Sequence, residues 1–174
     1  MRTAGLPYLV GTSGEQTALQ RVAIQDRDIS EGELQDLLDR CPGLVPAERF
    51  DEGFAPVVSL GREIHGVDNL YIAPNGRLTL IETKLWRNPQ ATREALAQLL
   101  DYAVRLSRMS ADDLEQACRN APRSALAAGD TLHSFVAAQC PDQVAEESVF
   151  YDGLASSLRK GRFLLLIVGD GIRE

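Results

Sequence analysis

The sequence is poor in cysteine, in long apolar runs and in basic charge, and each shortage excludes a class of protein. The three cysteines (Cys41, Cys118 and Cys140) are scattered and odd in number, which argues against a disulfide framework or a zinc site of paired cysteines. No apolar run approaches the ~20 residues of a membrane span, and the first five residues lack the apolar core of a signal peptide. We therefore expect a cytoplasmic protein with no membrane partner.

The net charge of −7 weighs against a dedicated nucleic-acid-binding module, which normally carries a basic face. It does not exclude a nuclease, because some of the acidic residues would bind metal and a local basic patch can still contact phosphate. Candidates for that patch, each also readable as an ordinary solvated charge, are Arg62, Arg77, Lys84, Arg87 and Arg93.

A chain of 174 residues is long enough for one domain, or for one domain and part of a second. We divide it into N-terminal strands (1–27), a core (28–108) and a helical extension (109–174). Within the core, apolar patterning predicts a helix from 31, strands at 56–64, 67–73 and 77–85, and a long helix from Pro89 to about 108. Beyond it, we expect helices from 111 and over 146–159, a helix or strand at 131–139, and a buried strand at 163–168.

The turn signal Pro74-Asn75-Gly76 joins two of these strands, and its length decides which residues face each other. A two-residue loop would pair Asp68 with Thr83. A three-residue loop, with Gly76 in the left-handed region, pairs Asp68 with Glu82. It also pairs Leu70 with Leu80 and Ile72 with Leu78. Because slipping by one residue moves every side chain to the other face, this apolar matching favours the three-residue loop.

In that register, two carboxylates and a lysine converge at the end of a sheet. Glu82 and Lys84 are two residues apart and therefore share a face of the strand. We expect the carboxylates of Asp68 and Glu82 to lie roughly 3–6 Å apart, within reach of a shared hard cation. Such proximity should raise the pKa of one carboxyl unless Lys84 compensates. Oxygen ligands beside a cationic group suit metal-assisted phosphodiester hydrolysis.

This arrangement resembles the PD-(D/E)XK nuclease superfamily. The family pattern of an acidic residue on one strand, Glu-x-Lys on the next and then a helix reads here as Asp68, Glu82-Thr83-Lys84 and the helix from Pro89. A valine, Val67, replaces the usual proline. Gln98 and Tyr102 resemble the Gln-x-x-x-Tyr motif of RecB-type nucleases, and their spacing puts both on one face of a helix. The resemblance covers residues 28–108 and is only moderately specific, because Glu-x-Lys alone is common.

The resemblance implies a restriction-endonuclease-like α/β fold with a mixed central sheet flanked by helices. It further implies an endo- or exonuclease that needs Mg²⁺ or Mn²⁺ and cleaves nucleic acid, preferably DNA, in restriction, repair or defence. Asp68, Glu82 and the carbonyl of Thr83 would bind the metal, and Lys84 would orient water or neutralise charge. Gln98 would help hold Lys84 or a phosphate, with Tyr102 beside it. Glu33 occupies a place comparable to a glutamate on the family's first helix.

Plainer interpretations stand beside each of these roles. Asp68 can be a turn residue, and Glu82 and Lys84 an exposed ion pair worth at most ~1 kcal/mol in an unrelated α/β protein. Glu33 is fully explained by a capping box with Ser30. The motif residues Gln98 and Tyr102 can be packing residues with polar ends. The main alternative function is a catalytically silent domain of this fold that binds nucleic acid or a protein partner.

The apolar run at 163–168 is the last strong signal in the chain. Its six consecutive apolar residues predict a strand within the body of the fold, with 146–159 as the crossover that covers the sheet. A buried strand followed at once by a turn normally leads to another element. We therefore expect a further domain C-terminal to residue 174, or a homodimer, to cover apolar surface near Ile172.

Overall fold

A computed structural model describes residues 8–10, 15–18, 29–85 and 91–170. After a small N-terminal hairpin, one helix leads into three strands, and four helices then lead into a last strand. The elements in chain order are β1 (Tyr8–Val10), β2 (Gln16–Ala18), α1 (Glu31–Arg40), β3 (Val58–Ile64), β4 (Val67–Ile72), β5 (Leu78–Leu85), α2 (Ala91–Leu106), α3 (Ala111–Asn120), α4 (Leu132–Gln139), α5 (Glu147–Lys160) and β6 (Leu164–Asp170). Short 3₁₀ turns at Pro42–Leu44, Ala47–Arg49 and Glu52–Phe54 connect α1 to β3.

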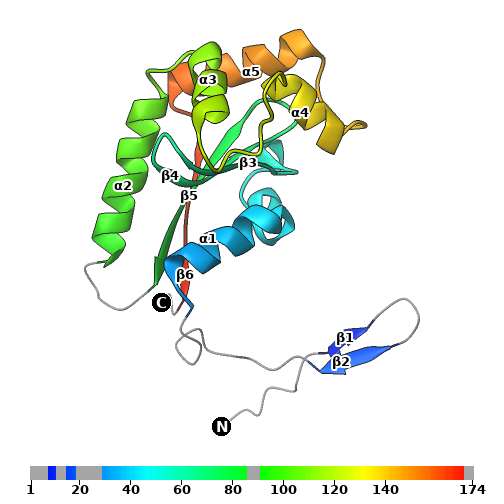
Figure 1. Ribbon diagram of the computed structural model, residues 1–174, viewed down its shortest axis with the longest axis vertical. Coiled ribbons are helices and arrows are strands. Elements are labelled where there is room, and N and C mark those ends of the chain that lie inside the picture. The colour runs from blue at the N-terminus through cyan, green and yellow to red at the C-terminus, as the bar shows by residue number, and fades with distance from the viewer. Residues whose placement is uncertain (1–7, 11–14, 19–28, 86–90, 171–174) are drawn as a thin grey trace.

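The main sheet has the strand order β3-β4-β5-β6 and is mixed. β3, β4 and β5 are antiparallel neighbours, whereas β6 lies parallel to β5. Parallel neighbours need a crossover connection, and α2 to α5 provide it. Figure 1 shows α1 on one side of this sheet and α2, α3 and α5 on the other. The sequence prediction of a mixed sheet flanked by helices is therefore confirmed.

The two faces of the sheet are packed differently. The face toward α2–α5 carries the larger apolar core, in which Leu70, Ile72 and Leu80 contact side chains of these helices. The face toward α1 has a smaller apolar cluster around Tyr71 and Ile81. Alternation along β4 and β5 sends neighbouring residues to opposite faces, so a run of apolar residues serves both layers.

The hairpin register matches the sequence prediction. Leu70 lies opposite Leu80 and Ile72 opposite Leu78. The turn closes with an Ala73 carbonyl that accepts from the Gly76 amide at 2.9 Å, and Gly76 has a φ of 81°. A left-handed residue at this point of a three-residue loop is the geometry that glycine supplies without strain.

Several local predictions are confirmed and others are refined. β1 and β2 form an antiparallel pair, Ser30 and Ser110 cap their helices with capping boxes, and residues 132–139 are helical. The strand at 163–168 belongs to the main sheet but is only half-buried, because β6 has a described neighbour on one side only.

Two predictions cannot be compared with the structure. The cap at Asn88-Pro89 and the surface near Ile172 lie outside the described residues. Within those residues, the structure has no helix that is long and apolar enough to cross a membrane.

Candidate functional site

The register of β4 and β5 brings the two predicted carboxylates to the same end of the sheet. The β4–β5 register ends with the pair Asn69 and Ile81. Continuing it by one residue sets Asp68 opposite Glu82. Directly opposed residues of an antiparallel pair share a face. The plainer interpretation treats Glu82 and Lys84 as an exposed ion pair. Glu82 is only 2% exposed, so the structure does not contain such a pair.

Burial strongly perturbs Glu82. The pKa of its carboxyl is raised to about 7, first by desolvation and then by the negative charge of Asp68. Lys84 and a hydrogen bond from Tyr102 act in the opposite direction, and Glu31 adds to the increase. The Glu82 Oε2 atom is buried and has no hydrogen-bond partner among the residues that the structure describes. The predicted rise in the pKa of one carboxyl is found, but its first cause is burial of Glu82, and the repulsion from Asp68 on which the prediction rested comes second.

Asp68 is held by the neighbouring strand through its side chain. Its Oδ2 atom accepts hydrogen bonds from both the amide and the hydroxyl of Thr83, each at 2.8 Å. The Thr83 amide sits where the next ladder bond to Val67 would fall, so the Asp68 carboxylate replaces a main-chain carbonyl as its acceptor. The β4–β5 pairing therefore ends in a carboxylate with a defined orientation.

Lys84 forms an ion pair with α1. Its Nζ atom lies 3.8 Å from Oε2 of Glu31, and its charge lowers the pKa of Glu82. The other oxygen of Glu31 accepts from the Leu85 amide at 3.0 Å. One helix residue thus contacts β5 twice at the end where the predicted site lies.

Glu31 is a residue that the sequence analysis missed, and Glu33 was named in its place. Glu33 is exposed, and its carboxylate accepts from the amide and hydroxyl of Ser30 in a capping box. The capping box in the sequence could have pointed to Glu31. Since it already occupies Glu33, the remaining acidic residue of the first turn, Glu31, is the one free to reach the sheet.

The two residues of the predicted helix motif differ in their surroundings. Tyr102 is buried, its hydroxyl donates to Glu82, and the guanidinium of Arg105 lies 5.0 Å from its ring centroid. Gln98 is exposed. Of the two motif residues, only Tyr102 is therefore buried against the sheet. The structure gives no role to Gln98.

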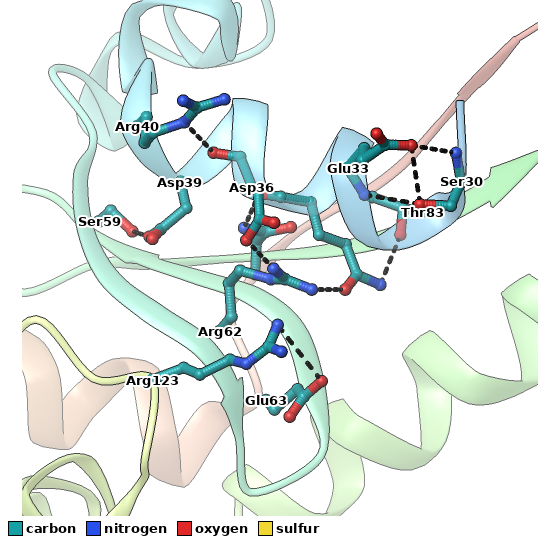
Figure 2. Close-up of polar contacts among 12 residues, drawn as sticks. Ser30, Glu33, Asp36, Asp39, Arg40, Ser59, Arg62, Glu63, Thr83 and Arg123 are labelled. Carbon is teal, nitrogen blue, oxygen red and sulfur yellow. Dashed lines mark hydrogen bonds and ion pairs between the residues drawn. The ribbon is translucent and has the colours of Figure 1, made fainter. Parts of the chain in front are cut away.

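Two arginines proposed for phosphate contact have other partners. Arg62 is 3% exposed and binds Asp36 on α1, as Figure 2 shows. A side chain buried to this extent cannot reach a phosphate in solvent, so the prediction of a phosphate contact by Arg62 is wrong. Arg77 lies beside the hairpin turn at the opposite end of the strands, where it pairs with Asp51. Arg93 is exposed and Arg87 lies outside the described residues.

The donor set fits a hard divalent cation with few protein ligands. Across the described ranges, no group of three or more His, Cys, Asp or Glu side chains is arranged to hold a metal. Mg²⁺, however, is usually bound through one or two carboxylates and keeps several waters. An unpartnered buried oxygen on Glu82, beside Asp68, is a free acceptor of the kind such an ion requires.

Comparison with known protein families, with curated proteins and with solved structures finds no match for this chain. The function must therefore be argued from the arrangement of its own residues.

Proposed function

We propose that this chain is a nuclease domain of the restriction-endonuclease-like type, which hydrolyses phosphodiester bonds with Mg²⁺ or Mn²⁺. The observation that carries the proposal is the buried Glu82 carboxyl, with one unpartnered oxygen, next to Asp68 at the end of two paired strands. A buried carboxyl beside a second carboxylate lowers the stability of the fold, and groups with strongly perturbed pKa values cluster at functional sites.

The chain's own residues would divide the work. Asp68, Glu82 and the Thr83 carbonyl would hold the ion, which when bound would acidify a coordinated water and neutralise charge on the phosphoryl group. Lys84 would place a positive charge where negative charge develops. Tyr102 donates to Glu82 and would keep that carboxyl oriented. Glu31 holds Lys84 at the end of β5.

Nucleic acid, with DNA as the preferred substrate, is the partner that this chemistry serves. The net charge of −7 requires the contact to be local, at the carboxylate end of the sheet. Cation binding would itself remove part of the negative charge there. We accordingly expect substrate binding to depend on the divalent ion.

The test combines metal binding with cleavage. We expect calorimetry to detect Mn²⁺ binding to the wild type, and supercoiled or linear DNA to be cut only when Mg²⁺ or Mn²⁺ is present. Glu82→Gln keeps the size of the side chain but removes its charge, and should abolish both. Glu33→Gln is the matched control, because it changes a carboxylate on α1 that serves the capping box.

The outcomes separate this proposal from its main rival. Mn²⁺ binding without cleavage of DNA or RNA, combined with retained nucleic-acid or protein binding, would identify a catalytically silent domain. Absence of Mn²⁺ binding in the wild type would contradict the proposed metal site.

A further inference from the structure

A strip of polar side chains lies between α1 and the sheet, beneath the proposed site. On the sheet side it contains Arg62, Asn69 and Thr83, and on the helix side Gln35 and Asp36. Arg62 donates to Asp36 and to the Oε1 atom of Gln35. The Gln35 Nε2 atom donates to the Thr83 hydroxyl at 2.9 Å. Asn69 adds a bond of 3.0 Å to the main-chain carbonyl of Gln35. Figure 2 shows Arg62 reaching from β3 toward α1, with Thr83 near the start of that helix.

The direction of the hydrogen bonds that run from Arg62 through Gln35 and Thr83 to Asp68 follows from one residue. A guanidinium can only donate, so the Gln35 amide must turn its oxygen toward Arg62. Its NH₂ group then faces Thr83, whose hydroxyl oxygen accepts. The single hydroxyl proton is left to donate onward, and its acceptor is Oδ2 of Asp68 at 2.8 Å. Arg62 therefore sets a polarity that ends on a carboxylate of the proposed site.

We propose that Gln35 is a positioning residue, which acts through the Thr83 hydroxyl to hold the Asp68 carboxylate against β5. Arg62, which is itself only 3% exposed, fixes the orientation of Gln35 because a guanidinium can only donate. The Thr83 amide, bound to the same oxygen at 2.8 Å, reports the orientation of Asp68. The inference deepens the proposed function, because a fixed Asp68 is useful to a metal site, but the hydrogen-bond relay can be tested without any metal.

Amide hydrogen exchange on the whole protein, without divalent ions, gives the direct test. In Gln35→Met the Thr83 hydroxyl loses its donor and can turn its proton away from Asp68. Asp68 then keeps only the bond from the Thr83 amide, and that bond is weakened because the carboxylate is less firmly held. We expect that amide to exchange about tenfold faster. The amides of Thr79 and Ile81, which bond to β4 main-chain carbonyls, should be unchanged. An unchanged rate at Thr83 would overturn the proposal. So would an equal increase at all three amides, which would mean only that α1 had come loose.

A matched control separates positioning from docking of the helix. Ser59 donates to Asp39 on the next turn of α1, and Figure 2 shows this contact apart from Thr83. Asp39→Ala removes one bond between helix and sheet without touching the relay, and should leave the Thr83 amide unchanged. If Asp39→Ala accelerates it as much as Gln35→Met, the positioning role is refuted.

A second variant protects the test against misfolding. Gln35→Met leaves a buried donor of Arg62 without an acceptor, which costs stability. Gln35→Glu keeps that acceptor but presents oxygen to Thr83 as well, so the hydroxyl proton turns away from Asp68. Exchange at the Thr83 amide should again rise several-fold, and an unchanged rate would overturn the relay.

Metal binding is measured separately on the same proteins. Residues that orient a metal ligand typically change metal affinity 10–100-fold when they are replaced, so we expect Gln35→Met to weaken Mn²⁺ binding about tenfold. Asp39→Ala should retain wild-type affinity, because it removes a contact between α1 and the sheet that lies outside the relay. If the wild type does not bind Mn²⁺, the proposed function fails, while the exchange rates still decide whether Gln35 positions Asp68.

Discussion

The two ends of the β4–β5 hairpin are built from the same strands in one register, yet they differ in almost every other respect. At the turn end, Ile72, Leu78 and Leu80 are fully buried and the main-chain ladder is complete. At the open end, Asp68 replaces a ladder acceptor, and Glu82 keeps a buried oxygen without a partner. The main-chain polar groups at the turn end are hydrogen-bonded within the ladder, whereas the open end has a buried carboxyl oxygen that accepts no hydrogen bond from the described residues.

The difference shows how one hairpin can combine a well-packed end with an end that holds a strongly perturbed carboxyl. Apolar pairs at the turn end fix the register, and that register carries the carboxylates to the opposite end. At the open end, the Glu82 carboxyl is buried near the negative charge of Asp68, and both conditions make its charged form less stable. Changes at the turn end should therefore affect folding, whereas changes at the open end should affect titration and metal binding.

The largest effect is expected from Gly76→Ala at the turn end. Gly76 has a φ of 81°, and an added Cβ would lie 2.4 Å from the Phe150 carbonyl and 2.7 Å from the Leu154 amide. Strain and overlap together should lower the free energy of unfolding by about 3 kcal/mol or more, measured by urea denaturation. Gly129→Ala is the control, since it has positive φ but nothing within 4 Å, and should cost clearly less. Equal losses would mean that contact with α5 does not constrain the turn.

The next largest effect is expected from Glu82→Gln at the open end, where the variant should become more stable than the wild type as the pH rises. The unfolded chain releases the Glu82 proton near pH 4.5 and the folded chain near pH 7. Between these values the folded state binds more protons, so this residue lowers stability as pH rises and the loss is complete above pH 7. Without divalent ions, Glu82→Gln should be more stable than the wild type at pH 8, by on the order of 3 kcal/mol, and about equal at pH 4. Denaturation curves at both pH values check this, and a difference that does not change with pH would contradict it.

A smaller effect is expected from Tyr102→Phe. The Tyr102 hydroxyl lowers the pKa of Glu82 by donating to it, so its removal should raise that pKa further. The ring remains to pack on Arg105, and the loss of stability should be about 1 kcal/mol. Carboxyl ¹³C NMR titration of Glu82 measures the shift. An unchanged or lower pKa in the variant would contradict the hydrogen bond from Tyr102 to Glu82.

The smallest effect compares two glutamates on α1. Glu31 raises the pKa of Glu82 and pairs with Lys84, so Glu31→Gln should lower the Glu82 titration midpoint modestly. Glu33 is bound in the capping box, and Glu33→Gln should leave the midpoint where it is. The same NMR titration distinguishes them, and a larger shift from Glu33→Gln would reverse the assignment.

Much of the fold follows from local signals in the sequence. The Ser30 capping box, the Pro74-Asn75-Gly76 turn and the apolar pairs around it are short-range features, and each is found as predicted. The length of the turn and the apolar pairs beside it predict Asp68 opposite Glu82, and period-two alternation puts both on one face of the sheet. The resemblance to a nuclease family depends on these same local patterns, and it stays a prediction.

Only the tertiary structure decided which polar groups meet across elements. Glu31 and Glu33 are both acidic residues of one helical turn, and the position of α1 over the sheet selects Glu31. The route from Arg62 through Gln35 and Thr83 to Asp68 joins residues far apart in sequence. Such contacts have no sequence period, because they depend on how a helix docks on a sheet. Sequence alone therefore determined the positions of the strands and the register of the β4–β5 hairpin, while helix docking determined how the candidate site is supported.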